Sequence, residues 1–246
     1  MADRDTVELF GLRFDRLTRA QAAESVVRLA QSGGKHYVVK PYSEFIPRAR
    51  RDPKVREILS GASLCLADGV GIVWASRFLG RPFPQAMRGI DFTWEMLEAI
   101  DRAGLSVYLL GGTPDEVRLT AERIHERLPA LRVAGTHQGH LTEGQTAEVV
   151  REINTASPDV LLVAMGFPRQ ELWIAKHLPS LNVSVAVAEG GSFSFISGTV
   201  SRAPRWMRRT GLEWAYRLLR QPWRLRRQLA LPVFVWLVIV ERFRRR

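Results

Sequence analysis

Four arginines near the C-terminal end of the chain are spaced like one face of a helix. Arg217, Arg220, Arg224 and Arg227 follow one another at steps of three, four and three residues, and 3.6 residues make one helical turn. A face packed into a core would carry leucines at these positions. Guanidinium groups stay charged and can donate two parallel hydrogen bonds to phosphate oxygens. The spacing therefore indicates a surface that binds an anion.

Asp68 is an acidic residue placed where acid–base chemistry is possible. It follows the apolar run at 63–67 and precedes Gly69 and Gly71. An Asp before a helix most often caps that helix by accepting a backbone hydrogen bond, and spacing alone favours this role. The alternative is a general base that takes the proton of a substrate hydroxyl.

Two glycine-rich turns follow other apolar runs. Gly111 and Gly112 precede a predicted helix start, and Gly190 and Gly191 form a second turn of the same kind. Backbone amides at a helix N-terminus can hold a phosphate or a ribose. Simple strand-to-helix turns are the alternative at both places. The complete G-x-G-x-x-G pattern is absent, which disfavours a dinucleotide cofactor.

Gln170 and Glu171 stand in the first turn of a predicted helix, directly after an apolar run. A glutamate there favours the helix dipole whatever else it does, and a glutamine can hydrogen-bond a sugar or a base edge. The five histidines show no metal-ligand spacing. No G-x-S-x-G elbow and no Walker loop is present.

Apolar runs that resemble buried strands alternate with longer amphipathic stretches. Strands are predicted at 36–40, 63–67, 106–111, 132–136, 159–166 and 183–189, after a short hairpin around Gly11. Helices are predicted at 18–31, 69–79, 90–103, 114–128, 143–156, 168–178, 204–220 and 222–243, with start signals at Thr18, Thr113 and Thr142.

Continuous apolar strands are typical of a parallel sheet covered on both faces. The pattern predicts an α/β fold, a Rossmann-like doubly wound and mostly parallel sheet over residues 1–201. Residues 202–246 are predicted to form an Arg-rich helical appendage with an apolar tip. Ligands of such sheets bind at the carboxyl ends of the strands, which is where Asp68 and the glycine turns stand.

The net charge of +11 belongs to the C-terminal part of the chain. Residues 202–246 hold 13 arginines and two acidic residues, whereas basic and acidic residues balance in 1–201. This asymmetry predicts an anionic partner: lipid headgroups, nucleic acid or a polyphosphate-bearing ligand. The longest apolar stretch, 229–240, is too short to span a bilayer. Its flanking arginines favour a helix at an anionic membrane surface; the alternative is a terminal helix docked on the body or on a second subunit.

The single cysteine, Cys65, excludes an intrachain disulfide framework and fits a reducing compartment. The opening residues are polar and of mixed charge, so no signal peptide is predicted.

Five blocks of the sequence resemble the WecG/TagA/CpsF family of bacterial glycosyltransferases. The matching blocks are residues 67–80, 88–92, 108–117, 158–177 and 189–227. The resemblance implies an inverting enzyme that needs no metal or other cofactor. Such an enzyme moves a hexose of the N-acetylmannosamine, N-acetylmannosaminuronate or glucose type from a UDP-sugar to a polyprenyl-diphosphate-linked saccharide in surface-polysaccharide synthesis. It implies a cytoplasmic protein, peripheral on the inner face of the bacterial plasma membrane, and allows a homo-oligomer.

The resemblance also implies roles for single residues. Asp68 matches the proposed general base on the acceptor hydroxyl. Arg217, Arg224 and Arg227 match arginines that meet the UDP diphosphate, where they can do the work of a bound cation. The residues expected to bind substrate, from the matching blocks and the strand ends together, are Lys40, Tyr42, Arg88, Gly111, Gly112, Gln170, Glu171, Gly190 and Gly191.

Three places depart from the family pattern. Many relatives carry Thr-Pro-Asn where this chain has Lys40-Pro41-Tyr42, and they often carry an Asp where Ser194 stands; Glu189 is also unusual ahead of the glycine pair. Lys40 is expected either to bind an acidic sugar or a phosphate, or to pair with Glu44.

A nucleic-acid-binding protein is the alternative function. The arginines of the C-terminal part alternate with Trp206, Trp214 and Trp223, and tryptophans can stack on bases. A nicotinamide-dependent oxidoreductase is a third hypothesis, disfavoured by the incomplete glycine pattern. The family resemblance favours the transferase, with no nucleic-acid partner.

Overall fold

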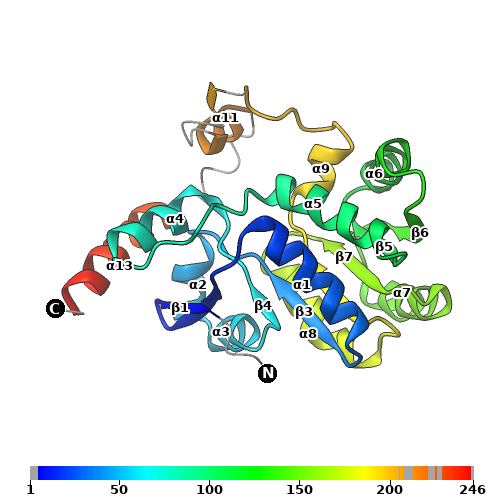
Figure 1. Ribbon diagram of the computed structural model, residues 1–246, viewed down its shortest axis with the longest axis horizontal. Helices are drawn as coiled ribbons and strands as arrows, with labels where there is room; N and C mark the ends of the chain where they lie inside the picture. The colour runs from blue at the N-terminus through cyan, green and yellow to red at the C-terminus, as the bar shows by residue number, and fades with distance from the viewer. Residues whose placement is uncertain (1–4, 205, 208–212, 221–224, 226–228, 245–246) are drawn as a thin grey trace.

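The computed structural model describes residues 5–204, 206–207, 213–220, 225 and 229–244 (Figure 1). Its first element is an antiparallel hairpin of β1 (Thr6–Leu9) and β2 (Leu12–Asp15). Phe10 and Gly11 turn the hairpin, both with positive φ. This confirms the hairpin predicted around Gly11.

Six parallel strands form the central sheet in the order β4-β3-β8-β7-β5-β6. Their bounds are β3 (His36–Val39), β4 (Leu64–Cys65), β5 (Ser106–Gly111), β6 (Arg132–His137), β7 (Val160–Ala164) and β8 (Val185–Ala188). The predicted doubly wound parallel sheet is therefore confirmed. Because every strand runs the same way, the carboxyl ends meet along a single edge of the sheet.

Helices cover both faces of this sheet (Figure 1). Val160 and Leu162 of β7 pack in one cluster with α1 (Arg19–Gln31) and α5 (Gly89–Arg102). Leu161 and Val163 pack in another with α7 (Glu143–Ala156) and α8 (Arg169–His177). Strands buried on both faces need apolar side chains at every position, as these sequences have. The helices are α1 (Arg19–Gln31), α2 (Phe45–Arg51), α3 (Pro53–Ser60), α4 (Gly69–Phe78), α5 (Gly89–Arg102), α6 (Pro114–Arg127), α7 (Glu143–Ala156), α8 (Arg169–His177), α9 (Ser192–Ile196), α11 (Glu213–Arg220) and α13 (Ala230–Arg244), with a 3₁₀ turn at Leu178–Ser180.

The helices α2 and α3 are additions to the predicted elements. Each contains a proline, and because proline usually breaks a helix the sequence does not predict them. Pro47 is the third residue of α2 and Pro53 is the first of α3. A proline in the first turn removes only an amide that has no intrahelical partner. Asp52 caps α3 by accepting a hydrogen bond from the Val55 amide at 3.4 Å.

The C-terminal helix α13 docks on the body along one face. Phe234, Leu237 and Val238 are buried in the cluster that also holds the hairpin, α2 and α4, and the Phe234 ring lies 5.7 Å from that of Phe10. No helix in the described part of the chain is both long and apolar enough to cross a membrane. The division into a body (1–201) and an appendage (202–246) stays a prediction.

Candidate active site

Backbone hydrogen bonds join the ends of β4 and β3, and separately the ends of β8, β7 and β5, at the carboxyl edge of the sheet. The Asp68 amide donates to the Pro41 carbonyl at 3.0 Å, which links the ends of β4 and β3. The Glu189 amide donates to Val163 at 2.8 Å and the Gly112 amide to Ala164 at 3.1 Å, which link β8 and β5 to β7. Most of the predicted site residues thus lie along one edge.

Asp68 is both a helix cap and a candidate base. Its Oδ1 accepts hydrogen bonds from the Gly69 amide at 2.7 Å and the Gly89 amide at 3.1 Å, at the first residues of α4 and α5. The capping role favoured by spacing is therefore confirmed. Within the described residues no hydrogen bond reaches Oδ2, and the side chain is half-buried. One carboxylate oxygen is fixed by the fold, and the other accepts no hydrogen bond from the described residues.

The electrostatic surroundings of Asp68 suit a base. Burial raises the pKa of the Asp68 carboxyl, while the positive charge of Lys40 and the two backbone hydrogen bonds oppose that rise. The negative charge of Glu189 also raises the pKa of Asp68, by a smaller effect. A carboxylate with a raised pKa holds a proton better than an ordinary Asp does, which is what proton abstraction from a hydroxyl requires.

Lys40 is buried and forms an ion pair with Glu189, its Nζ lying 2.8 Å from Oε2. Glu189 follows β8, the neighbour of β3 in the sheet. Thr93 of α5 donates its hydroxyl proton to the same Oε2 at 2.6 Å. The sequence does not reveal Thr93 as a site residue by motif. Its signal is periodicity, because a threonine stands on the face of α5 that otherwise buries Ile90, Met96 and Leu97.

Gly111 and Gly112 are required by close backbone packing. A Cβ on Gly111 would lie 2.5 Å from the Ala164 carbonyl oxygen, and its φ is +149°. Gly112 also has positive φ, and its carbonyl accepts a hydrogen bond from the Gly139 amide at 2.9 Å. The turn is therefore held tightly between β7 and the segment after β6. Whether its amides also hold a ligand stays a prediction.

Replacing Gly111 with Ala is expected to destabilise the protein by about 2–4 kcal/mol, because the new methyl group meets backbone that cannot move aside. Thermal or urea unfolding measures this change. Gly144→Ala is the matched control: Gly144 lies in α7 with open space where a Cβ would point, so stability should stay the same or rise. Equal stability of both variants would contradict the tight turn.

Gln170 braces two of the strand ends. Its Oε1 accepts hydrogen bonds from the Gly190 amide at 2.9 Å and the Gly166 amide at 3.1 Å, and its Nε2 donates to Glu171 at 2.8 Å. Gln170 and Glu171 are both buried. The structure thus gives Gln170 a positioning role, between the turn before α8 and the Gly190-Gly191 turn before α9; contact with substrate stays a prediction.

Tyr42 and Arg88 flank Asp68. The Cβ of Tyr42 would lie 3.5 Å from a Cβ on Gly69, and its ring packs edge-on against Phe45 at 4.7 Å. Arg88 is exposed and stands immediately before α5 with a left-handed backbone, φ 49°. Each lies next to a glycine whose amide bonds the Asp68 carboxylate, so both stay candidates for substrate contact.

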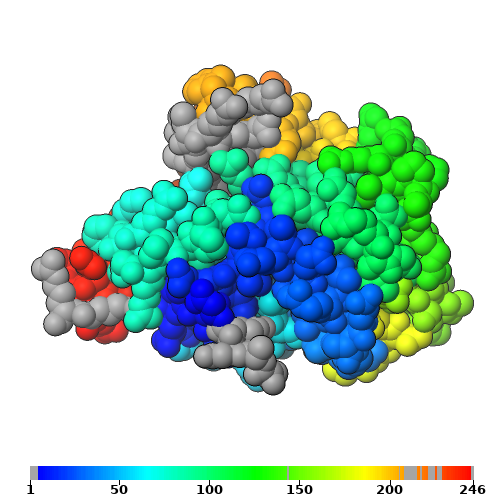
Figure 2. Space-filling model, in the orientation of Figure 1, coloured from blue at the N-terminus to red at the C-terminus, as the bar shows by residue number. Residues whose placement is uncertain are grey.

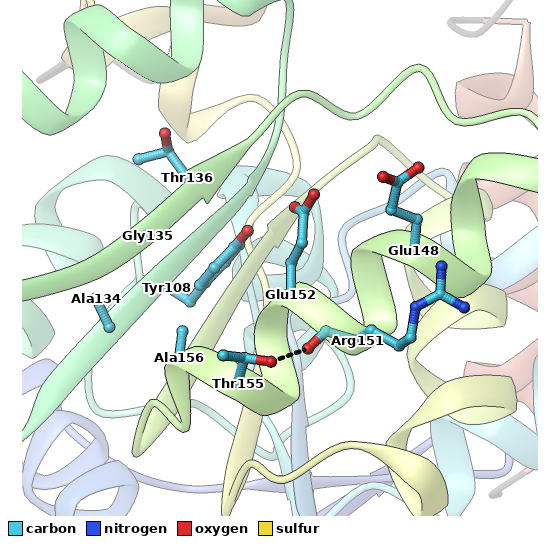
Figure 3. A pocket seen from close by; sticks show the side chains of 9 residues that line it. All are labelled: Tyr108, Ala134, Gly135, Thr136, Glu148, Arg151, Glu152, Thr155 and Ala156. Carbon is cyan, nitrogen blue, oxygen red and sulfur yellow. Dashed lines mark hydrogen bonds between the residues drawn. The ribbon is translucent and has the colours of Figure 1, made fainter.

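A wide, shallow hollow of about 680 Å³ lies elsewhere, between β5, β6 and α7 (Figure 3). Tyr108 and Glu152 both line it; burial raises the pKa of Tyr108 to about 12, and the carboxylate of Glu152 adds to the rise. None of the predicted site residues lines this hollow. We therefore place the candidate active site at the strand ends.

Metal-ligating groups do not gather in the described part of the chain. No set of three His, Cys, Asp or Glu side chains there could hold an ion. The sequence has one D-x-D pattern, at residues 3–5. Its last residue, Asp5, forms an exposed ion pair with Arg16 at 3.3 Å.

Comparison with known proteins identifies the family. The model of the glycosyl transferase WecG/TagA/CpsF family matches residues 7–246. The chain belongs to this family. It is therefore a glycosyltransferase, and the predicted family resemblance is confirmed.

Three relatives of this chain have the same curated name, N-acetylglucosaminyldiphosphoundecaprenol N-acetyl-beta-D-mannosaminyltransferase. The protein of Bacillus spizizenii is 34% identical over 203 residues, which are 82% of this chain and 78% of the relative. The protein of Bacillus subtilis strain 168 is 33% identical over 193 residues, which are 78% of this chain and 75% of the relative. The protein of Staphylococcus aureus strain MW2 is 32% identical over 233 residues, which are 94% of this chain and 91% of the relative.

The arginines that the WecG/TagA/CpsF pattern assigns to the diphosphate are described only in part. Arg217 lies on α11, but its side chain is not described, and Arg224 and Arg227 lie outside the described residues. Arg220, on the same helix, places its guanidinium 5.6 Å from the centre of the Tyr216 ring. Arg202 pairs with Asp91 in the first turn of α5 at 2.8 Å. The diphosphate role stays a prediction.

Ser194, a departure from the WecG/TagA/CpsF pattern, has a defined partner. Its hydroxyl donates to Glu116 Oε1 at 2.7 Å, and Thr199 donates to the same oxygen at 3.1 Å. Glu116 also caps α6 through the Thr113 amide. Burial works to raise the pKa of Glu116, but these hydrogen bonds outweigh it and the pKa is lowered. Ser194 thus ties α9 to the Gly111-Gly112 turn.

Proposed function

We propose that this chain transfers N-acetylmannosamine from UDP-N-acetylmannosamine to an N-acetylglucosaminyl-diphospho-polyprenol. The observation that carries the proposal is Asp68, a carboxylate with one oxygen fixed by two helix starts and the other unbonded within the described residues. The choice of sugar and acceptor is supported by the curated relatives, all three of which are named for this transfer. Transfer of an N-acetylmannosaminuronate or a glucose is the alternative.

The proposed reaction is a direct displacement. Asp68 Oδ2 takes the proton from a hydroxyl of the acceptor sugar as that oxygen attacks the anomeric carbon of the donor. The bond from the anomeric carbon to the UDP oxygen breaks, and UDP leaves with the bonding electrons. One displacement inverts the anomeric configuration. The proton on Asp68 then passes to solvent, which restores the carboxylate.

The leaving group is proposed to be stabilised by arginines rather than by a metal ion. Charge develops on the UDP diphosphate as the bond breaks, and permanently charged guanidinium groups can meet it in a bidentate way. Arg217, Arg224 and Arg227 are the candidates. All three belong to the predicted appendage.

A donor panel tests the proposed function. Purified full-length protein is incubated with a synthetic N-acetylglucosaminyl-diphospho-lipid and, separately, with UDP-N-acetylmannosamine, UDP-N-acetylmannosaminuronate or UDP-glucose. Mass spectrometry of the lipid product should show the mass of one added N-acetylhexosamine with the first donor alone. A product with either other donor instead would contradict the choice of sugar, and no product with any donor would contradict transfer to this acceptor.

We further propose that the chain meets its lipid-linked acceptor on an anionic membrane surface through α4 and α13. The two helices lie side by side at one end of the molecule (Figures 1 and 2), and Arg242 of α13 lies 5.9 Å from the Phe78 ring of α4. Both helices turn large apolar side chains to solvent. These, which we term the apolar platform, are Val70, Trp74, Phe78, Val235, Trp236, Ile239 and Phe243.

The chemistry of the apolar platform suits a lipid interface. Trp74 is 45% exposed and Trp236 59% exposed, and tryptophan is enriched where membrane meets water. Arg242 and Arg244 lie in the last turn of α13, where they can reach anionic headgroups. The platform begins two residues after Asp68, so a lipid-held acceptor would stand close to the base. The inner face of the plasma membrane is the proposed location, because UDP-sugars are the donors.

Replacing Trp74 and Trp236 together by Glu is expected to lower binding to anionic lipid vesicles by about tenfold or more, because two large apolar side chains lose their burial in lipid. Vesicle co-sedimentation measures this, and activity on a detergent-soluble acceptor should persist. Gly144→Glu adds the same kind of charge on exposed α7 as a control. Unchanged vesicle binding would contradict the membrane role, and a change of oligomeric state alone would show that the platform is a subunit interface.

A further inference from the structure

Lys40 and Glu189 form an ion pair that water does not reach. Their side chains are 5% and 0% exposed, and Nζ and Oε2 are 2.8 Å apart. The Phe92 ring lies beside the ammonium group, with its centre 5.4 Å from Nζ. Charges in such surroundings are weakly screened, so they act strongly on other ionisable groups nearby.

Stability is a weak reason for this pair. A buried ion pair is often replaceable by apolar residues without loss, because desolvation offsets the attraction. Here the desolvation is compensated only in part, since Glu189 Oε1 is buried and has no hydrogen-bond partner among the described residues. Unsatisfied buried oxygens are rare in folded proteins and call for an explanation. A nearby group on which the pair acts would supply one.

Asp68, on the neighbouring segment, is the candidate for that group. Lys40 stands between Val39 and Pro41, whose carbonyls accept hydrogen bonds from the Leu66 amide at 2.9 Å and the Asp68 amide at 3.0 Å. The segment that carries the lysine is thus paired along its length with the segment that carries the base. The Lys40 charge is the largest single effect that opposes the burial of Asp68, and Glu189 acts on Asp68 in the opposite sense.

Helix α5 connects the same groups from the other side. Its Gly89 amide donates to Asp68 Oδ1 at 3.1 Å, and one turn later the Thr93 hydroxyl lies 2.6 Å from Glu189 Oε2. The Thr93 oxygen also lies 2.9 Å from the Gly89 carbonyl and 3.2 Å from Ser192 Oγ. The Thr93 hydroxyl has one proton to donate. The Glu189 carboxylate is a stronger acceptor than the Gly89 carbonyl or the Ser192 hydroxyl, so the proton is assigned to Glu189.

We propose that Lys40, Glu189 and Thr93 form a positioning ring for Asp68, in which Lys40 keeps the Asp68 carboxylate ionised and Glu189, held by Thr93, keeps Lys40 in place. None of the three needs to touch the substrate. The proposal explains two departures from the family pattern together, since Lys40 and the unusual Glu189 are each other's partners. It rests on the proposed function only in that Asp68 is the base.

The remaining charged and titratable groups around Asp68 are few in the described residues. Arg88 precedes Gly89 and is exposed to solvent. Asp91 is paired with Arg202, and Tyr42 lies next to Gly69. Because Arg88 is screened by water and Asp91 is neutralised by its partner, Lys40 and Glu189 are expected to be the two charged side chains that act most on the pKa of Asp68, beside its burial and its two backbone hydrogen bonds.

The test is a titration of Asp68 in full-length protein, by NMR of carboxyl-¹³C-labelled aspartate, with the signal assigned through Asp68→Asn. Lys40→Met should move the Asp68 midpoint up by about one pH unit, and Glu189→Gln should move it down. Lys40→Met with Glu189→Gln should give a midpoint between those of wild type and Lys40→Met. This double variant leaves no unpaired buried charge, so it serves if Lys40→Met alone does not fold. Arg19→Met, which breaks the pair at 2.6 Å between Arg19 and Glu95 of α5, is the control and should leave the midpoint unchanged.

The acid limb of kcat/KM should move in the same direction as the NMR midpoint, because the base works only when deprotonated. Variants that lose rate without moving either midpoint would overturn the positioning ring and leave a structural role. The NMR readout does not depend on turnover. If wild type transferred no sugar, the proposed function would fail while the titration still decided whether the ring acts on Asp68.

Discussion

Replacing Asp68 by Asn should lower kcat by about 10²–10⁴-fold, the usual contribution of a general base, while UDP binds as tightly as before. Asparagine keeps an oxygen that can accept the Gly69 and Gly89 amides, which bond Oδ1 in the structure, so both helix starts should stay capped. What is lost is the oxygen that takes the proton. Fixed-time transfer assays measure kcat, and isothermal titration calorimetry with UDP measures the affinity for UDP.

Asp52→Asn is the matched control for this variant. Asp52 caps α3 by accepting from the Val55 amide, so it has the same structural role as Asp68 but lies outside the strand-end site. Its replacement should leave kcat unchanged. If Asp68→Asn turned over as fast as wild type, Asp68 would be a cap and nothing more.

Replacing Arg217, Arg224 and Arg227 together by Glu should abolish measurable transfer and weaken UDP binding. One donor to a developing negative charge is worth about 10²–10³-fold in rate, and three reversed charges repel the diphosphate as well. The expectation rests on family membership, which is shown by the match over residues 7–246. The measurement is kcat/KM for the donor together with the Kd of UDP.

Arg220→Glu is the control for charge reversal on α11, the helix that carries Arg217. Its guanidinium packs on the Tyr216 ring, and it lies outside the set that the family pattern assigns to the diphosphate. Turnover should fall little. Should the triple variant keep both UDP affinity and rate, the arginines would have no part in the reaction.

The sequence predicts the sheet well because its strands are buried on both faces. Such strands are continuous apolar runs, and all six predicted runs coincide with observed strands to within two residues at either end. The shortest strand is β4, which pairs with β3 only at Leu64 and Cys65. Leu66 then bridges to Asp15 at the end of the hairpin. The apolar run is longer than β4 because the chain stays buried after Cys65, where the strand has already ended.

The site is predictable only where one short segment carries the chemistry. Asp68 stands before two glycines, and its capping role follows from that local pattern. The positioning ring does not, since Lys40, Thr93 and Glu189 are far apart in sequence and meet only because β8 lies beside β3. That strand order is a tertiary property. Gln170 is a similar case: its position at a helix start is visible in the sequence, but the Gly190 amide that occupies its oxygen is not.

The most direct test of the proposed mechanism is the anomeric configuration of the transferred sugar, determined by NMR of the product made by wild type in the presence of EDTA. Direct displacement with Asp68 as the base and arginines at the diphosphate predicts an inverted anomeric centre at a rate that the chelator does not lower. A retained configuration, or transfer that returns only when magnesium or manganese is added, would contradict it.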